Sequence, residues 1–177
     1  MNRVVVIGCP GSGKTTFSIQ LAALVGLPLI HLDALYHKEG WSLDVNTKKI
    51  EWIAMMNNLV ASDLWIIDGN YKSTMAIRME AADTIIFLDY PRYLSLWRVL
   101  VRRFKFRNTQ RPDMPTTWKE RISWDFMKLI WNYGTEQRPT VLKRLESYSK
   151  DKTIYILTRP EDVGEFFVTL KIKKTNS

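Results

Sequence analysis

The chain has 177 residues, of which 46% are hydrophobic and 12% aromatic, a composition that is typical of one globular domain and excludes a disordered or fibrous chain. Its formal net charge of +8 is concentrated, because seven basic residues and no acidic residue lie between Pro91 and Arg111. This distribution favours a local anion-binding site over a generally basic surface.

The single cysteine, Cys9, excludes an intrachain disulfide and a zinc site built from several cysteines, and it is compatible with a reducing compartment. The first residues, MNRVVVIG, lack the long apolar region and the cleavage site of a signal peptide. No apolar run in the sequence approaches the roughly 20 residues that cross a bilayer. We therefore expect a cytoplasmic protein with no membrane partner.

Strand-like apolar runs alternate with helical patterns along the chain. Strands are expected at residues 4–7, 29–32, 65–67, 85–88 and 154–157. Helices are expected near residues 14–25, 47–61, 72–81, 93–106, 117–132, 140–150 and 161–170. The alternation predicts a single domain over residues 1–177 with an α/β fold, in which a five-stranded parallel sheet is flanked by helices.

The first expected strand and helix enclose the sequence GCPGSGKTT, which fits the phosphate-loop (P-loop) pattern G-x-x-x-x-G-K-[ST]. Its glycines let backbone N–H groups approach a polyphosphate, while Lys14 can reach the β- and γ-phosphates and the Thr15 hydroxyl can bind Mg²⁺. The residues expected to bind the nucleotide here are Gly8, Pro10, Gly11, Ser12, Gly13, Lys14, Thr15 and Thr16.

Two carboxylates follow expected strands, Asp33 after the second and Asp68 at the end of the third. Both should face the P-loop, because ligands of an open α/β sheet bind at the carboxyl ends of its strands. We expect Asp68 to organise Mg²⁺ and Asp33 to orient the acceptor. Asp89 after the fourth strand is an open alternative for the magnesium role, although Gly69 beside Asp68 permits closer approach of a ligand.

Three further side chains near these carboxylates have open roles. His31 and His37 lack additional ligands at zinc-like spacing, so we expect structural or acceptor-contacting roles for them. Trp41 could stack on a planar acceptor or belong to the core.

Arg98 and Arg102 are four residues apart and share one face of an expected helix. Two guanidinium groups on one face could stabilise the charge of a phosphoryl group in transfer. The alternative is a solvated basic face. The apolar residues expected to pack this helix are Leu94, Trp97, Leu100, Val101 and Phe104.

These motifs resemble those of adenylate-kinase-like P-loop kinases, most closely the bacterial DNA topology modulation proteins. GCPGSGKTT is similar to the family's phosphate loop, WIIDGNYK to its strand followed by D-G-F-P-R, and DYPRYLSLWRVLVRR to the segment that carries its pair of lid-base arginines. The resemblance implies a nucleoside monophosphate kinase-like fold that uses ATP and Mg²⁺. It also implies an acceptor-binding segment at about residues 31–62 and a lid insertion at about residues 104–138.

The resemblance implies further site residues. TVLKRLESY resembles a helix that offers a phosphate-contacting arginine, here Arg144, and Arg159 lies with Thr158 and Pro160 where the family has its adenine loop. Lys72 would contact an acceptor phosphate. Tyr36, however, stands where adenylate kinases have an arginine on that phosphate, which counts against AMP as the acceptor.

The expected lid also departs from the strand-built lids of the longer adenylate kinases. It contains three tryptophans at near-helical spacing, which favours a packed helical lid over a row of base-stacking side chains. These residues are Trp118, Trp124 and Trp131.

The sequence thus predicts an ATP-dependent kinase that transfers a phosphoryl group to a small-molecule acceptor, for example a nucleoside monophosphate. The expected catalytic residues are Lys14, Asp33, Asp68, Arg98, Arg102 and Arg144. A less favoured alternative is an ATP-binding regulator that associates with nucleic acid, and a third is a plain ATPase. The sequence does not specify the acceptor, the choice between ATP and GTP, or the oligomeric state.

Overall fold

The computed structural model describes residues 1–36, 45–105 and 123–175. Its strands form one parallel five-stranded sheet in the order β2-β3-β1-β4-β5. Their bounds are β1 (Arg3–Gly8), β2 (Leu29–His31), β3 (Trp65–Asp68), β4 (Thr84–Leu88) and β5 (Thr153–Leu157). The predicted α/β fold with a parallel sheet is confirmed.

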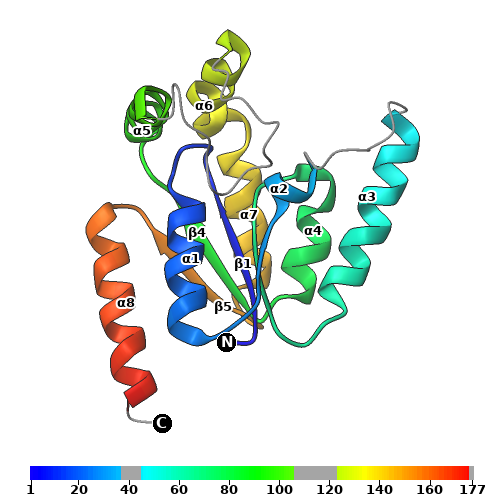
Figure 1. The fold of residues 1–177 in the computed structure, drawn as a ribbon, viewed down its shortest axis with the longest axis vertical. Helices are drawn as coiled ribbons and strands as arrows, with labels where there is room; N and C mark the ends of the chain where they lie inside the picture. The colour runs from blue at the N-terminus through cyan, green and yellow to red at the C-terminus, as the bar shows by residue number, and fades with distance from the viewer. Residues whose placement is uncertain (37–44, 106–122, 176–177) are drawn as a thin grey trace.

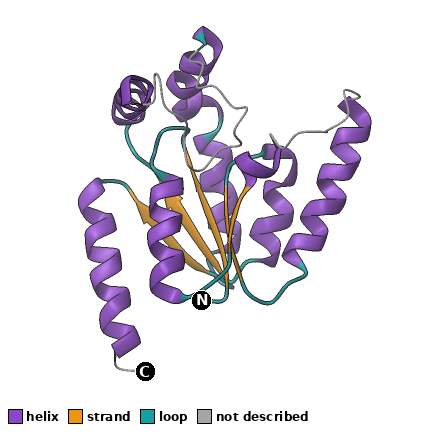
Figure 2. Cartoon of the chain, in the orientation of Figure 1, coloured by secondary structure: helices purple, strands orange, loops and turns teal. Residues whose placement is uncertain are grey.

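Helices cover both faces of this sheet, as Figures 1 and 2 show. They are α1 (Lys14–Val25), α2 (Leu32–Tyr36), α3 (Val45–Val60), α4 (Lys72–Ala81), α5 (Arg92–Lys105), α6 (Trp124–Glu136), α7 (Arg138–Tyr148) and α8 (Pro160–Thr175). In Figure 1, α5 and α6 lie above the edge of the sheet to which the P-loop belongs. None of the helices in the described ranges is long and apolar enough to cross a membrane.

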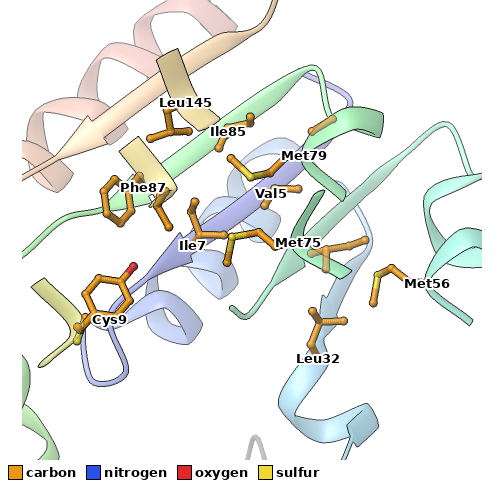
Figure 3. Close-up of a cluster of buried hydrophobic side chains, with 14 of the residues drawn as sticks. Val5, Ile7, Cys9, Leu32, Met56, Met75, Met79, Ile85, Phe87 and Leu145 are labelled. Atoms are coloured by element: carbon orange, nitrogen blue, oxygen red, sulfur yellow. The ribbon is translucent and has the colours of Figure 1, made fainter. Parts of the chain in front are cut away.

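The side chains of β1 alternate between two hydrophobic cores, because successive residues of a strand point to opposite faces. Val5 and Ile7 pack in the core that α3, α4 and α7 cover, and Figure 3 shows both beside Met75 and Met79. Val4 and Val6 pack in the other core, under α1 and α8. Burial on both faces explains why the parallel strands are continuous apolar runs in the sequence.

Several boundaries of strands and helices differ from the predicted ones. The second strand ends one residue early, because Leu32 begins α2. Helix α7 begins at Arg138, two residues before the predicted start, since Pro139 fits the first turn of a helix. Of the expected lid, residues 106–122 lie outside the described residues, and α6 begins at Trp124, where the Ser123 side chain accepts a hydrogen bond from the Phe126 N–H at 3.1 Å.

The predicted packing of α5 is wrong in its orientation. Trp97 is 64% exposed and Phe104 is 75% exposed, so the apolar stripe faces outward. The buried face instead contains Ser95 and Val99, which contact the P-loop where Gly11 has no side chain. Helical periodicity identified the two faces of α5, but it could not show that the backbone of a distant loop covers the arginine side.

Candidate active site

The P-loop joins β1 to α1 and depends on two glycines with left-handed backbone angles, Gly11 (φ 83°) and Gly13 (φ 90°). A side chain at Gly11 would place its Cβ 2.5 Å from the Ser95 carbonyl oxygen and 2.7 Å from Val99 Cγ2. Gly13 precedes α1 and supplies no side-chain cap, so the first N–H groups of the helix remain available to an anion. The loop is therefore shaped as a phosphate cradle.

Lys14 lies at the centre of the loop, where its Nζ donates to the carbonyl oxygens of Gly8 at 3.0 Å and Cys9 at 3.1 Å. Burial lowers the pKa of Lys14, while the charges of Asp33 and Asp68 oppose this shift and the charge of Arg102 adds to it. These influences come from α2, β3 and α5, so side chains far apart in the sequence converge on one ammonium group.

Asp68 is buried beside His31, its register partner on the neighbouring strand. His31 Nδ1 lies 3.0 Å from Asp68 Oδ1, whereas Asp68 Oδ2 is buried without a hydrogen-bond partner. An unpaired buried carboxylate oxygen is costly unless a cation or a donor binds it. Asp68 Oδ2 therefore fits a cation such as Mg²⁺, which takes few protein ligands beside phosphate and water oxygens.

No group of three or more His, Cys, Asp or Glu side chains within the described ranges could hold a metal ion by itself. His37, the other histidine considered for a metal, and Trp41 lie outside the described residues.

Asp89, the alternative magnesium ligand, is engaged elsewhere. Arg138 Nε donates to both of its carboxylate oxygens, at 2.8 and 2.9 Å. The hydrogen bond and charge of Asp89 raise the pKa of Arg138. The pair lines a cavity of about 450 Å³ together with Cys9 and Tyr133. Because both oxygens of Asp89 are paired, the geometry favours Asp68 for Mg²⁺.

The arginines of α5 face the P-loop. Arg98 Nη1 donates to the Ser12 carbonyl oxygen at 2.8 Å, and its guanidinium carbon lies 4.9 Å from the centre of the Tyr90 ring. Arg102, one helical turn further, is close enough to Lys14 to lower its pKa. This arrangement brings three cations together around the loop.

The structure does not bring Arg144 to this cluster. In the described residues its charge acts on Tyr148, whose hydroxyl donates to Glu80 Oε2 at 2.9 Å near the end of α4. Arg138, two turns earlier in α7, is the residue of this helix that reaches the carboxyl end of β4. Sequence similarity had identified the helix but not which of its arginines lies near the sheet edge.

The predicted adenine loop follows β5 and is held by Asp162. The Asp162 carboxylate accepts from the N–H groups of Thr158 at 2.8 Å and Arg159 at 3.0 Å, and these bonds lower its pKa to about 2. Arg159 Nη2 also donates to Asp162 at 3.0 Å, although the Arg159 side chain is 69% exposed. The loop thus presents Arg159 at the surface, paired with Asp162.

Two residues that the sequence did not identify hold the loops of the site, because Asn70 bonds to the P-loop and Arg78 bonds to the β3–α4 loop. The Asn70 side chain donates to the Gly8 carbonyl oxygen at 2.7 Å and accepts from the Gly8 N–H at 3.2 Å. Arg78 is fully buried and donates to the carbonyl oxygens of Gly69 at 2.7 Å and Asn70 at 2.9 Å. Burial lowers the pKa of Arg78 to about 10. A single arginine among the buried methionines of α4 was the signal available in the sequence.

The acceptor side of the crevice is made of carboxylates and aromatic rings. Asp33 is exposed in the first turn of α2, and the rings of Tyr36, Trp52 and Tyr71 form a contact cluster with centroid distances of 4.9 to 5.3 Å. Burial raises the pKa of Tyr71, and so do the charge of Asp33 and a hydrogen bond to it. Lys72 is exposed at the first position of α4.

The two described lid tryptophans have different environments. Trp131 lies under the Arg92 guanidinium, 4.0 Å from its carbon, and is 52% exposed. Trp124 is 83% exposed, and Trp118 lies outside the described residues.

The sequence was compared with known protein families and curated proteins. No family model matches the sequence. The chain is 30% identical to the adenylate kinases of Mycobacterium tuberculosis and Mycobacterium bovis over 112 residues, which are 60% of this chain. The match spans only 58% of the length of those curated relatives.

Solved structures match nearly the whole chain at low identity. A shikimate kinase from Acinetobacter baumannii in complex with shikimate has a TM-score of 0.59 at 18% identity, covering 98% of this chain and 94% of its own. A gluconokinase from Sinorhizobium meliloti has a TM-score of 0.52 at 17% identity, covering 99% and 94%. The sheet, the P-loop and these likenesses define the fold of the P-loop kinases.

Proposed function

We propose that the protein is an ATP-dependent phosphotransferase that moves the γ-phosphoryl group of ATP to a small acceptor bound beyond the carboxyl ends of β2 and β3. The observation that carries this proposal is the geometry of the P-loop: Lys14 Nζ is held by the carbonyl oxygens of Gly8 and Cys9, Arg98 bonds to Ser12 of the same loop, and the buried Asp68, whose charge acts on Lys14, has an oxygen without a partner. A plain phosphate-binding loop needs the lysine and the backbone amides but not a second carboxylate. Asp33, in the first turn of α2 directly after β2, is the second carboxylate whose charge acts on Lys14, and we assign it to the acceptor.

Each residue has a defined role in this proposal. The loop amides and Lys14 hold the β- and γ-phosphates, and Thr15 and Asp68 bind Mg²⁺, which supplies charge neutralisation when it is bound. An oxygen of the acceptor forms a bond to the γ-phosphorus while the bond from that phosphorus to the bridging oxygen of ADP breaks. Asp33 accepts the proton of the acceptor hydroxyl, and Arg98 and Arg102 stabilise the charge on the transferred group.

Several finer assignments belong to the same proposal. The likeness of GCPGSGKTT, WIIDGNYK and DYPRYLSLWRVLVRR to DNA topology modulation proteins supports membership of that group. We place the protein in the cytoplasm, with ATP as the donor and Arg159 beside its base. We also treat residues 1–177 as one domain.

The rival hypothesis, a regulator that binds nucleic acid through its arginine-rich helix, needs arginines that point outward. Arg98 instead bonds to the P-loop. The side chains that this rival would use, those of Lys105 and Arg107, lie outside the described residues.

The test is a screen of small acceptors with ATP and Mg²⁺, in which wild type is compared with Lys14→Ala and Asp68→Asn. Transfer of phosphate by wild type, with a loss of at least about 10²-fold in each variant, supports the proposal. Circular dichroism and thermal melting show whether each variant is folded. Equal turnover by all three folded proteins would remove the assignment.

A further inference from the structure

A histidine and a carboxylate meet at the carboxyl ends of two neighbouring strands. His31 is the last residue of β2 and Asp68 is the last residue of β3, and the two are register partners in the parallel sheet. Neighbouring strands lie about 4.8 Å apart, so the side chains of register partners lie side by side. The His31 ring therefore reaches the carboxylate directly, and His31 Nδ1 lies 3.0 Å from Asp68 Oδ1.

The direction of this hydrogen bond follows from the chemistry of its partners. An ionised carboxylate has only acceptors, so the hydrogen must be on Nδ1 of the ring. The bond thus also sets which tautomer a neutral His31 adopts. His31 donates to Oδ1 and leaves Oδ2 of Asp68, which is buried and has no hydrogen-bond partner, as the oxygen that can bind a cation.

Among the residues that the structure describes, no other side chain donates to the Asp68 carboxylate. Burial lowers the pKa of Lys14 and of Arg78, and the charge of Asp68 opposes this shift in both side chains. The hydrogen bonds of these two cations, however, go to main-chain carbonyl oxygens of the P-loop, the β3–α4 loop and α4. The hydrogen bond from His31 therefore fixes the rotation of the carboxylate.

The orientation of a carboxylate matters for the cation that it binds. Mg²⁺ requires nearly ideal octahedral geometry, so a ligand oxygen must point in one direction. Groups that hydrogen-bond to a metal ligand orient it, and their loss typically lowers metal affinity by about 10- to 100-fold. The bond to Oδ1 gives Asp68 one orientation before nucleotide and metal bind.

From this geometry we infer that His31 is a positioning residue of the magnesium site, whose Nδ1–H group holds Asp68 Oδ1 and thereby directs Oδ2 at the cation that binds with ATP. The inference rests on the proposed phosphotransferase function and assigns a further residue of its metal site. Because His31 acts through Asp68, its loss should weaken the binding of the metal and not the binding of metal-free nucleotide.

Two variants of similar side-chain size test the role of the Nδ1–H group. In His31→Asn the amide nitrogen takes about the position of Nδ1 and keeps the donor, whereas His31→Leu removes it. Asp68→Asn, which replaces a carboxylate oxygen, is the reference for loss of the metal ligand. Mn²⁺ is the probe, and electron paramagnetic resonance measures its affinity for each protein saturated with a non-hydrolysable ATP analogue. Calorimetry measures binding of the analogue in EDTA, so the test needs no acceptor.

His31→Leu should weaken Mn²⁺ binding by about tenfold or more, while its affinity for the analogue in EDTA changes by less than about twofold. His31→Asn should remain within about threefold of wild type in both measurements. Adding His31→Leu to Asp68→Asn should cause no further loss of Mn²⁺ affinity, because the histidine acts through the carboxylate. Thermal melting shows whether each variant is folded, and His31→Ala replaces His31→Leu if the latter does not fold.

Three results would overturn the inference. They are an unchanged Mn²⁺ affinity in His31→Leu, an equal loss in His31→Leu and His31→Asn, and an equal loss of analogue binding in EDTA. If Asp68→Asn binds Mn²⁺ as wild type does while the analogue still binds, the inference also fails and the proposed function stands. If wild type does not bind the analogue, the proposed function itself fails.

Discussion

The donor side and the acceptor side of the proposed site differ in charge. The donor side, formed by the P-loop and α5, directs amides and the cations Lys14, Arg98 and Arg102 at one point. The acceptor side, formed by the ends of β2 and β3, presents Asp33 and aromatic rings. The difference is one of charge, because cations gather on the donor side, whereas the described acceptor side presents the Asp33 carboxylate and the exposed Lys72 beside aromatic rings. Each side can therefore be disabled separately.

The largest effect is expected on the donor side from Lys14→Ala. Because this ammonium group lies at the centre of the phosphate cradle, phosphoryl transfer should fall by about 10³-fold or more in steady-state assays. Lys143→Ala, which removes an exposed lysine of α7, is the matched control and should keep its activity. Similar losses in both variants would show that the P-loop lysine has no special role.

Arg98→Ala comes next, with an expected decrease in kcat of about 10²- to 10³-fold, since Arg98 is bonded to the P-loop. Arg144→Ala should change kcat by less than about threefold if Arg144 stays near Tyr148. Single-turnover kinetics on both variants decide between the structure and the family resemblance. A large loss in Arg144→Ala would mean that α7 moves toward the nucleotide.

Glycine substitutions should change stability in opposite directions in the P-loop and in an ordinary helix. Gly11→Ala should destabilise the fold by about 2 to 4 kcal/mol and weaken ATP binding, because the new Cβ would meet the Ser95 carbonyl oxygen at 2.5 Å in a left-handed backbone conformation. Gly134→Ala has open space in α6 and should stabilise it by up to about 1 kcal/mol. Urea unfolding measures both values. A neutral Gly11→Ala would contradict the close packing of the loop on α5.

Asn70→Ala should have the smallest effect, about tenfold on the KM for ATP. The substitution removes both hydrogen bonds between the β3–α4 loop and Gly8, while kcat at saturating ATP should change less. Asn57→Ala, at an exposed position of α3, is the control. An unchanged KM would show that the P-loop keeps its shape without this contact.

Local patterns predicted the P-loop and the strands better than the long-range contacts of the helices. The P-loop and the strands are encoded in short segments, so the parallel sheet was predicted correctly. The orientation of α5 was not, because it depends on contact between Gly11 and Val99, far apart in the sequence. The pairing of Asp89 with Arg138 and the burial of Arg78 likewise require the tertiary fold. Helical or strand periodicity in the sequence does not determine which distant residue pairs with a charged side chain.

The most direct test of the account is a crystal structure with a non-hydrolysable ATP analogue and Mg²⁺. The account predicts that the γ-phosphate lies about 3 Å from the loop amides, from Lys14 and from the guanidinium of Arg98 or Arg102, with Asp68 at the metal. A bound analogue with both arginines turned to solvent and Asp68 still without a cation would contradict it.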